Sequence, residues 1–353
     1  MHTFRKTLLA SAGLVSQLSA SLALAHADSP AYLPESHAPA GVMADHLHAT
    51  GEWMFGYRYM REDQKGMRHG SDRVGAAELS AAGYTMMPTG MTMDMHMLDI
   101  MYAVSDDLTL MLMPQYMSMD MSMKATATAM DGTGDTGDGH GQHGMAGHDH
   151  GTSGLGDTIF GGLFRIADGQ DYRLHSTLAV SVPTGSVKEK NADGSYVHYG
   201  MQLGSGTWDL LPSVTYNGGR DRLSWGAQLS ARLPMESENE AGFAFGEKYG
   251  ATTWGAYRVA DWLSLSLRLR YSKEGDIDGH YNGAHNHGSP PDLQANYGGE
   301  FLDYGLGLNL AMQQGVAAGV RLGLEWTGKI NANVNGYQLD RDDGLNLSLS
   351  YAF

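Results

Sequence analysis

The stretch Met91–Met123 constrains the fold more than any other part of the chain. It reads MTMDMHMLDIMYAVSDDLTLMLMPQYMSMDMSM, with two alternating segments on either side of a polar turn at Ser105–Asp107. Alternation with a period of two is typical of a β-strand whose two faces meet different surroundings. Two such strands joined by a short polar turn predict a β-hairpin.

Methionines gather on one face of this predicted hairpin. The face carries Met91, Met93, Met95, Met97, Asp99 and Met101 on the first strand, and Met111, Met113, Met117, Met119 and Met121 on the second. Folding about the turn is expected to set Met97 near Met113. It would likewise set Met93 near Met117, so that thioethers from the two strands form a ladder.

The same alternation continues through most of the chain. The other alternating segments are Glu52–Arg61, Thr158–Ile166, Tyr172–Val182, Thr207–Tyr216, Arg222–Leu233, Lys248–Val259, Trp262–Tyr271, Phe301–Leu310, Val316–Thr327 and Gly344–Phe353. With the hairpin they make about twelve strands of roughly ten residues, the length that a tilted membrane-spanning strand needs.

The predicted connections alternate in length. Short turns fall at Ser105–Asp107, Asp168–Asp171, Asn217–Asp221, Ala260–Asp261 and Gln313–Gly315, and long polar loops at Glu62–Gly90, Lys124–Gly154, Thr184–Gly206, Pro234–Glu247, Lys273–Gly299 and Gly328–Asp343. Bacterial outer-membrane barrels have short periplasmic turns and long external loops. We therefore predict an all-β, transmembrane antiparallel up-and-down barrel over residues 51–353, with an extracellular loop at 124–154. The alternative is a soluble β-sandwich, whose strands are usually shorter.

The N-terminus resembles a secretory signal. Residues 1–27 have a charged start at Arg5 and Lys6, an apolar part at Leu8–Leu24 and an A-x-A cleavage site at Ala25–Ala27. The apolar part is short and rich in Ser and Ala, which favours a cleaved signal over a membrane anchor. Residues 28–50 are rich in Pro, Ala and His without periodicity, and predict a periplasmic N-terminal extension.

Composition excludes several classes of function. The chain has 23 Lys and Arg against 39 Asp and Glu, so it has no basic surface for nucleic acid. It has no cysteine, which excludes disulfides and thiolate chemistry. Phosphate-loop and HExxH motifs are absent, and no spacing supports a triad built from His96, Asp94 and a serine. We predict that the protein is not an enzyme.

The barrel expectation decides which face meets lipid. A charge facing lipid costs roughly 2–4 kcal/mol near the midplane, so charged side chains are expected to point inward. These are Arg58, Asp157, Arg165, Arg173, His175, Asp209, Arg232, Arg258, Arg268, Arg270, Asp303, Arg321 and Glu325. Leu108, Leu110 and Leu112 then face outward and the methionines line the lumen, whereas Asp94 and His96 are expected outside, above the membrane edge. Such a lumen is either a narrow channel or a plugged one.

Thioethers are soft ligands that favour Cu(I) and, by the same logic, Ag(I), whereas imidazole suits Cu, Zn and Ni. Alternate methionines on a strand lie about 7 Å apart, close enough for a facing strand to complete a site. The candidate ligands on the hairpin are Met91, Met93, Met95, His96, Met97, Met111, Met113, Met117, Met119 and Met121. The alternative is that methionine fills space there as a flexible apolar residue.

Histidines gather in the long loop after the hairpin. Candidate metal ligands there are His140, His143, Met145, His148 and His150, among aspartates that also allow a Ca²⁺ site. The alternative is a solvated outer loop. Further histidines are His46 and His48, near Met43, and His280, His285 and His287. The sequence thus suggests capture of a soft ion outside, passage along the methionines and hand-over at the periplasmic end.

Three short motifs carry a resemblance to a known family. They are Gly154-Leu155-Gly156-Asp157, Val182-Pro183-Thr184-Gly185-Ser186 and Gly204-Ser205-Gly206-Thr207-Trp208-Asp209. From about Gly154 to Phe353 the chain resembles the outer-membrane transporters named for the "MetA-pathway of phenol degradation". The resemblance implies a barrel that moves small molecules and has no catalytic residues. The methionine hairpin and the histidine loop are not part of the family pattern.

The resemblance also implies partners and leaves the solute open. Phe353 at the C-terminus suits the signal read by the barrel-assembly machinery, and the other expected partners are outer-membrane lipid and a transported metal ion or small hydrophobic solute. The leading hypothesis is a channel for soft metal ions, copper first. The alternatives are a channel for small aromatic or hydrophobic compounds and a surface barrel that sequesters metal without flux.

Overall fold

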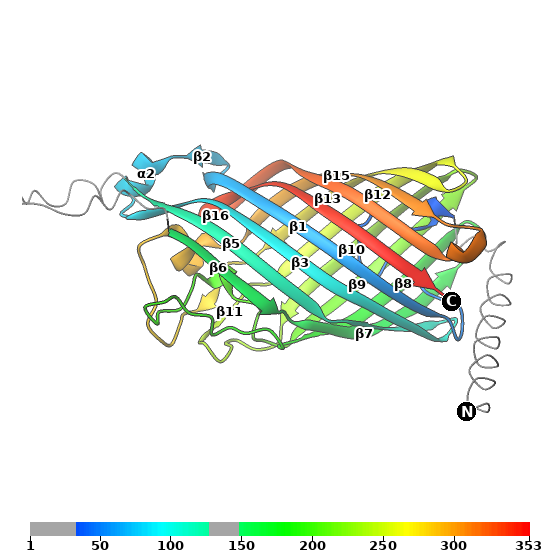
Figure 1. The fold of residues 1–353 in the computed structure, drawn as a ribbon, viewed down its shortest axis with the longest axis horizontal. Coiled ribbons are helices and arrows are strands. Elements are labelled where there is room, and N and C mark those ends of the chain that lie inside the picture. The colour runs from blue at the N-terminus through cyan, green and yellow to red at the C-terminus, as the bar shows by residue number, and fades with distance from the viewer. Residues whose placement is uncertain (1–32, 127–147) are drawn as a thin grey trace, which may run out of the picture.

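The structure is a computed structural model that describes residues 33–126 and 148–353. Within these residues, eleven strands form a closed antiparallel ring, because β1 pairs with β3 on one side and with β16 on the other (Figure 1). The ring strands are β1 (Trp53–Gly70), β3 (Met86–Ser105), β4 (Leu108–Met113), β7 (Thr158–Asp168), β8 (Tyr172–Val182), β9 (Asp209–Arg220), β10 (Leu223–Pro234), β12 (Lys248–Ala260), β13 (Leu263–Glu274), β15 (Gly299–Ala311) and β16 (Val320–Ala352). The predicted fold class is confirmed.

The last strand of the ring, β16, spans the barrel twice. β16 is 33 residues long and bends at Gly336, which has a positive φ of 54°. Its first arm pairs with β15 and its second arm pairs with β1. When each arm of β16 is counted as one strand, the described chain spans the barrel twelve times, in agreement with the prediction. The predicted loop at Gly328–Asp343 is wrong, because strand pairing continues through most of it.

The methionine hairpin has a break in its second strand. β5 (Gln115–Ala125) follows β4 after Pro114, whose ring lacks the N–H that a continuous ladder needs. The outer half of β3 pairs with β5, and β5 pairs in turn with β6 (His148–Leu155). The wall of the barrel therefore continues beyond the ring on this side, toward the long loops.

The register of the hairpin differs from the predicted one by two residues. Met101 lies opposite Met111, and Met95 lies opposite Met117. Met97 therefore lies diagonal to Met113, near it as predicted, because both belong to one packed cluster. Met93 lies opposite Met119 rather than Met117. The turn is centred on Asp106–Asp107, and an irregularity between Ala103 and Ser105 shifts the ladder there.

The two ends of the barrel differ. The long connections lie at one end, and the short turns and the C-terminus lie at the other (Figure 1). The small elements of the described chain are β2 (Asp72–Val74), α2 (Ala76–Ala81), η4 (Tyr199–Met201), β11 (Phe243–Ala244), β14 (Asp278–Gly279), η5 (Pro290–Asp292) and η6 (Gln294–Asn296) among the long connections, with η2 (Pro34–Ser36) and η7 (Gly315–Ala317) near the short turns. None of the described helices is long and apolar enough to cross a membrane.

The two faces of the wall have opposite character. Large apolar side chains such as Leu98, Leu267 and Leu306 are about half exposed on the outside. Charged side chains such as Arg268 and Glu325 are buried inside. This confirms the expected partition, in which lipid meets the apolar face.

Residues 33–50 lie inside the barrel at the end of the short turns; we call this segment the plug. Its backbone carbonyls accept hydrogen bonds from side chains around the ring: Arg58 binds the carbonyls of Ala40 and Val42, His175 that of Ala44, Asn217 that of Asp45 and Gln228 that of Met43. The described part of the segment predicted to be a periplasmic extension therefore fills the lumen at that end.

The lipid-facing assignment generates a prediction for Leu306, which is 50% exposed in the middle of β15. Leu306→Arg is expected to lower the free energy of unfolding by about 2–4 kcal/mol, because it places a charge in lipid. Urea unfolding of the barrel refolded in lipid vesicles measures this, with Leu306→Phe as the apolar control. Equal stability of the two variants would contradict the assignment.

Candidate functional site

Methionines from four neighbouring strands of the barrel share one inner surface, which we call the methionine wall. It consists of Met54 and Met60 on β1, Met91, Met93, Met95, Met97 and Met101 on β3, Met111 and Met113 on β4, and Met117, Met119, Met121 and Met123 on β5. Every methionine predicted on the hairpin belongs to it. Met54 and Met60 were not among the predicted candidates, although they share the inward face of Arg58.

The two ends of the methionine wall are covered by other parts of the chain. At the end of the short turns, Met97, Met101 and Met113 pack in one cluster with Ala44 and Leu47 of the plug. At the opposite end, Met121 and Met123 pack against Val197 and Met201 of the connection between β8 and β9. These methionines act at least as apolar packing, a role that their flexible side chains suit.

The middle of the wall faces open space. Met60, Met93 and Met95 line a cavity of about 110 Å³. Arg268, Arg270, Arg341, Lys329, Glu62 and Asp303 lie on the same cavity. Its volume exceeds what one water molecule needs, so the cavity can hold a small solvated guest between a soft surface and a charged one.

The charges on this cavity are largely paired. The guanidinium of Arg341 lies 2.9 Å from Glu274 and 3.7 Å from Glu62. Arg268 makes a two-pronged ion pair with Glu325, at 2.7 and 2.9 Å. The oxygens of Glu325 also accept from the Gly41 backbone N–H at 2.9 Å, so this buried pair holds the plug as well.

His96 lies apart from the methionine wall. It is exposed on the outer face, where its Nδ1 is 2.7 Å from the hydroxyl of Tyr57. On the same face the hydroxyl of Tyr59 donates to Asp94 at 2.5 Å. The outward orientation expected of Asp94 and His96 is confirmed, and the two residues form a polar patch with the tyrosines.

Part of the histidine loop lies outside the described residues: His140, His143 and Met145. His148 and His150 begin β6, at register positions opposite Met123 and Met121. The ring of His150 lies 5.8 Å from that of His198, whose Nδ1 is 2.7 Å from an oxygen of Asp292. Imidazoles and a carboxylate thus lie beside the outer end of the methionine wall.

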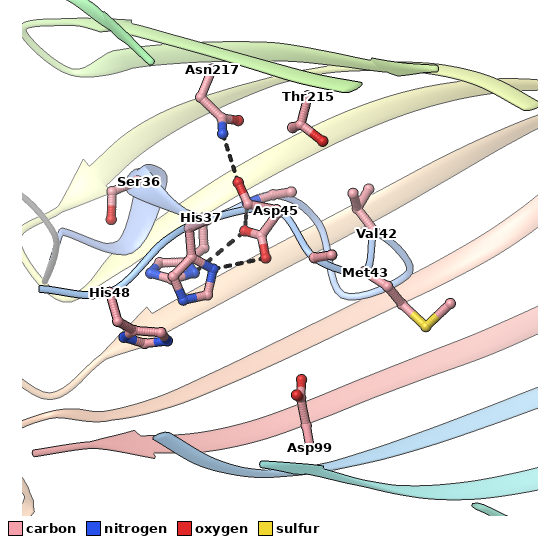
Figure 2. A network of polar contacts seen from close by, with 12 residues as sticks. Ser36, His37, Val42, Met43, Asp45, His48, Asp99, Thr215 and Asn217 are labelled. Atoms are coloured by element: carbon pink, nitrogen blue, oxygen red, sulfur yellow. Dashed lines mark hydrogen bonds and ion pairs between the residues drawn. The ribbon is translucent and has the colours of Figure 1, made fainter. Parts of the chain in front are cut away.

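A second group of polar side chains lies in the plug, inside the ring of strands (Figure 2). Asp45 has one oxygen 2.9 Å from Nδ1 of His46 and the other 3.4 Å from Nδ1 of His37. The rings of His46 and His48 are 4.7 Å apart. Burial lowers the pKa of His37 well below its usual value and lowers the pKa of His46, with the charge of Arg321 acting in the same direction. Both imidazoles are therefore neutral at neutral pH.

The sequence found this group only in part. His46 and His48 stood out as histidines near Met43, but His37 and Asp45 did not. No periodicity in residues 28–50 indicated that the segment folds back on itself within a barrel. The signal was missing because the plug is shaped by the wall around it rather than by its own sequence.

The three family-like motifs meet at one carboxylate. Asp157 accepts hydrogen bonds from the Gly185 N–H at 2.9 Å, and from the N–H and hydroxyl of Ser205 at 2.7 and 2.9 Å. A side chain at Gly204 would lie 2.4 Å from Asp157, which explains the glycine. The motifs therefore fasten both ends of the connection between β8 and β9 to the barrel.

Comparison with solved structures identifies the fold. The "COG4313 outer membrane channel" from Pseudomonas putida F1 is similar over 88% of this chain and 99% of its own, with 16% identity and a TM-score of 0.58. The chain has the fold of a bacterial outer-membrane β-barrel. A Pseudomonas aeruginosa FadL homologue shows a weaker similarity, with 10% identity and a TM-score of 0.43 over 90% of this chain and 96% of its own. No family model matches the chain, and no curated protein does.

This fold and the apolar exterior place the barrel in the outer membrane. Its lipid-facing surface carries apolar side chains around the ring, and its charges face the interior. The site to be explained is therefore the lumen: a soft wall, a charged wall opposite it, and a plug between them and the periplasmic end.

The pair of Glu325 and Arg268 generates a prediction for the plug. Glu325→Gln is expected to lower the free energy of unfolding by about 3–5 kcal/mol, because it leaves the Arg268 charge buried without its partner. It also weakens the contact to Gly41, so single-channel conductance in planar bilayers is expected to rise. Lys273→Gln is the control, since the exposed pair of Lys273 and Glu300 is worth about 1 kcal/mol or less. Wild-type conductance together with wild-type stability would show that Glu325 does not hold the plug.

Proposed function

We propose that the protein is an outer-membrane channel that conducts a soft metal ion along its methionine wall, with Cu(I) as the first candidate and Ag(I) bound by the same chemistry. The observation that carries this proposal is the methionine wall itself, which runs along β1, β3, β4 and β5 from the plug to the level of His150. A channel function is also consistent with the name of the similar structure from Pseudomonas putida F1.

The chemistry of the wall supports a soft ion. The interior of an outer-membrane barrel is usually polar, so a strip of thioethers within it needs a reason. Thioethers bind Cu(I) and Ag(I) in preference to hard ions, and in the absence of thiolates the binding is exchangeable. An ion can therefore pass between neighbouring methionines across the strand register, for example from Met93 to Met119 opposite it.

The order of these groups along the lumen supports a path for the ion from the outer end to the periplasmic end. His150 and His198 lie beside the outer end of the wall, the cavity at Met60, Met93 and Met95 lies in its middle, and the plug lies at the periplasmic end. Conduction then requires the plug to shift, because Ala44 and Leu47 cover the last methionines.

A second candidate is a channel for small hydrophobic compounds. The observation that favours it is the packing of Met121 and Met123 with Val197 and Met201, where the thioethers serve as an apolar surface. Methionine surfaces adapt to guests of different shape. In this alternative the lumen takes an uncharged guest and soft ions have no effect.

The cavity provides the test that separates the two candidates. The combined variant Met60→Leu, Met93→Leu and Met95→Leu keeps apolar volume at a cost below about 1.5 kcal/mol for each change. Silver(I) flux into vesicles that contain the barrel is expected to fall at least about tenfold, as even indirect changes to metal sites cause losses of that size. Met235→Leu with Met312→Leu, both exposed and outside the wall, is the control. Undiminished flux in the cavity variant would exclude the soft-ion pathway and favour a hydrophobic solute.

A variant of the histidine loop tests the alternative that the barrel only sequesters metal at its surface. A loop variant with His140, His143, His148 and His150 all changed to Ala is expected to retain Cu(I) binding, because the methionine wall is intact. Competition titration of the refolded barrel with a coloured Cu(I) chelator measures this. Loss of all Cu(I) binding in the loop variant would make the loop a surface scavenger.

A further inference from the structure

The plug contains a compact group of metal-type ligands that has no role in the methionine pathway. His37, Asp45 and His46 each offer one ligand atom, and these atoms all lie within 4.8 Å of one another. The three side chains are 15%, 6% and 14% exposed. Figure 2 shows the group inside the ring of strands, with His48 next to it.

Two nitrogens of this group have no partner. Nε2 of His46 and Nε2 of His48 are buried without a hydrogen bond, and His48 is only 5% exposed. A buried polar atom without a partner is costly, so such atoms usually have a ligand, water or ion to bind. A metal ion, which accepts nitrogen lone pairs, is a partner that these imidazoles lack.

The second nitrogen of His48 is held as it is in metal sites. Nδ1 of His48 lies 3.4 Å from Oε2 of Glu52. A metal-bound histidine generally gives its second nitrogen to a carboxylate, which fixes the ring and its tautomer. This contact leaves Nε2 of His48 available to an ion.

We infer that His37, Asp45 and His46 form a binding site for a divalent transition-metal ion, with His48 beside it as a further ligand. Ligands bound tetrahedrally at about 2.0–2.1 Å lie about 3.3–3.4 Å apart. Nδ1 of His37 lies 3.4 Å from Asp45, which matches this spacing, and an ion bound to Nδ1 of His46 would replace its 2.9 Å hydrogen bond to Asp45. Small rotations of the rings bring the three ligands together.

The donor set selects the class of ion. Two imidazoles and a carboxylate suit Cu(II), Ni(II) and Zn(II), of which Cu(II) generally binds most tightly. The site therefore differs from the methionine wall, which favours soft monovalent ions. Arg321 lines the cavity beside His37, Asp45 and His46.

The position of the ligands gives the site a structural consequence. His37 lies near the start of the plug, and Asp45 and His46 follow after the turn at residues 40–41. Figure 2 shows His37, Val42 and Asp45 along this segment. An ion bound to all three joins the two ends of this turn and closes a loop. The ion therefore fixes the shape of the plug within the lumen, where Glu325 and Arg58 hold its middle.

The experiment compares metal binding in full-length mature barrels that all carry the loop variant, so that the outer histidines do not contribute. Cu(II) and Zn(II) bound per chain are measured by equilibrium dialysis, with His37→Ala/His46→Ala as the test and the exposed His280→Ala as the control. The test variant is expected to lose one equivalent of each ion, with affinity lowered at least about a hundredfold. Hydrogen exchange of the plug backbone is expected to slow on addition of Zn(II) in the control only.

Equal stoichiometry and affinity in the two proteins would overturn the inference. If the double variant does not refold, as shown by a loss of heat-modifiable migration, His46→Gln replaces it, and unchanged binding in that protein overturns the inference equally. The site does not rest on the proposed function. If silver(I) flux does not depend on the methionine wall but Cu(II) still binds at the plug, only the proposed function is overturned. If silver(I) flux depends on the wall but Cu(II) does not bind at the plug, only this inference is overturned.

Discussion

The structure depends on the requirement that every backbone polar group in lipid finds a partner within the wall. β1 meets this requirement by pairing with β3 along one edge and with the second arm of β16 along the other. Once the ring is closed, the pleat leaves each residue only two directions, outward to lipid or inward to the lumen. The methionines at alternate positions of β3 and β5 share the inward direction with Asp99 because Leu98, Leu110 and Leu112 take the other one.

The interior is divided by charge. On one side the thioethers present a soft, uncharged surface, and on the other side Arg268, Arg341 and their carboxylate partners form a network in which each ion has a counterion close by. Such pairs are strong only when both members remain, because a single buried charge is costly. The plug uses this network as an anchor through Gly41, where a larger residue would collide with Glu325 at 2.4 Å. The same lumen thus combines firm anchoring with a surface suited to weak, exchangeable binding.

The sequence predicted those features that follow from local alternation. The fold class, the inward position of Arg268 and Glu325, and the outward position of His96 all come from a period of two. The register of the hairpin did not, because it depends on where the turn is centred and on an irregularity beside Ser105, and neither changes the alternation. The plug could not be predicted either. Its shape comes from contacts such as that of Asn217 with the Asp45 carbonyl, which join residues 172 positions apart and leave no local pattern.

The plug is joined to the last hairpin of the chain, and this connection bears on how the molecule is assembled. The bond between Gly41 and Glu325 spans 284 residues, and the seam between Met54 and Ala352 spans almost the whole described chain. Contacts of such long range form late, since the intervening chain must first be brought into place. The plug therefore reaches its final position only when the C-terminal hairpin arrives. A chain truncated before β16 would lose both the strand that closes the barrel and Glu325, which holds the plug. Such a truncated chain can therefore form neither a closed wall nor a plugged lumen.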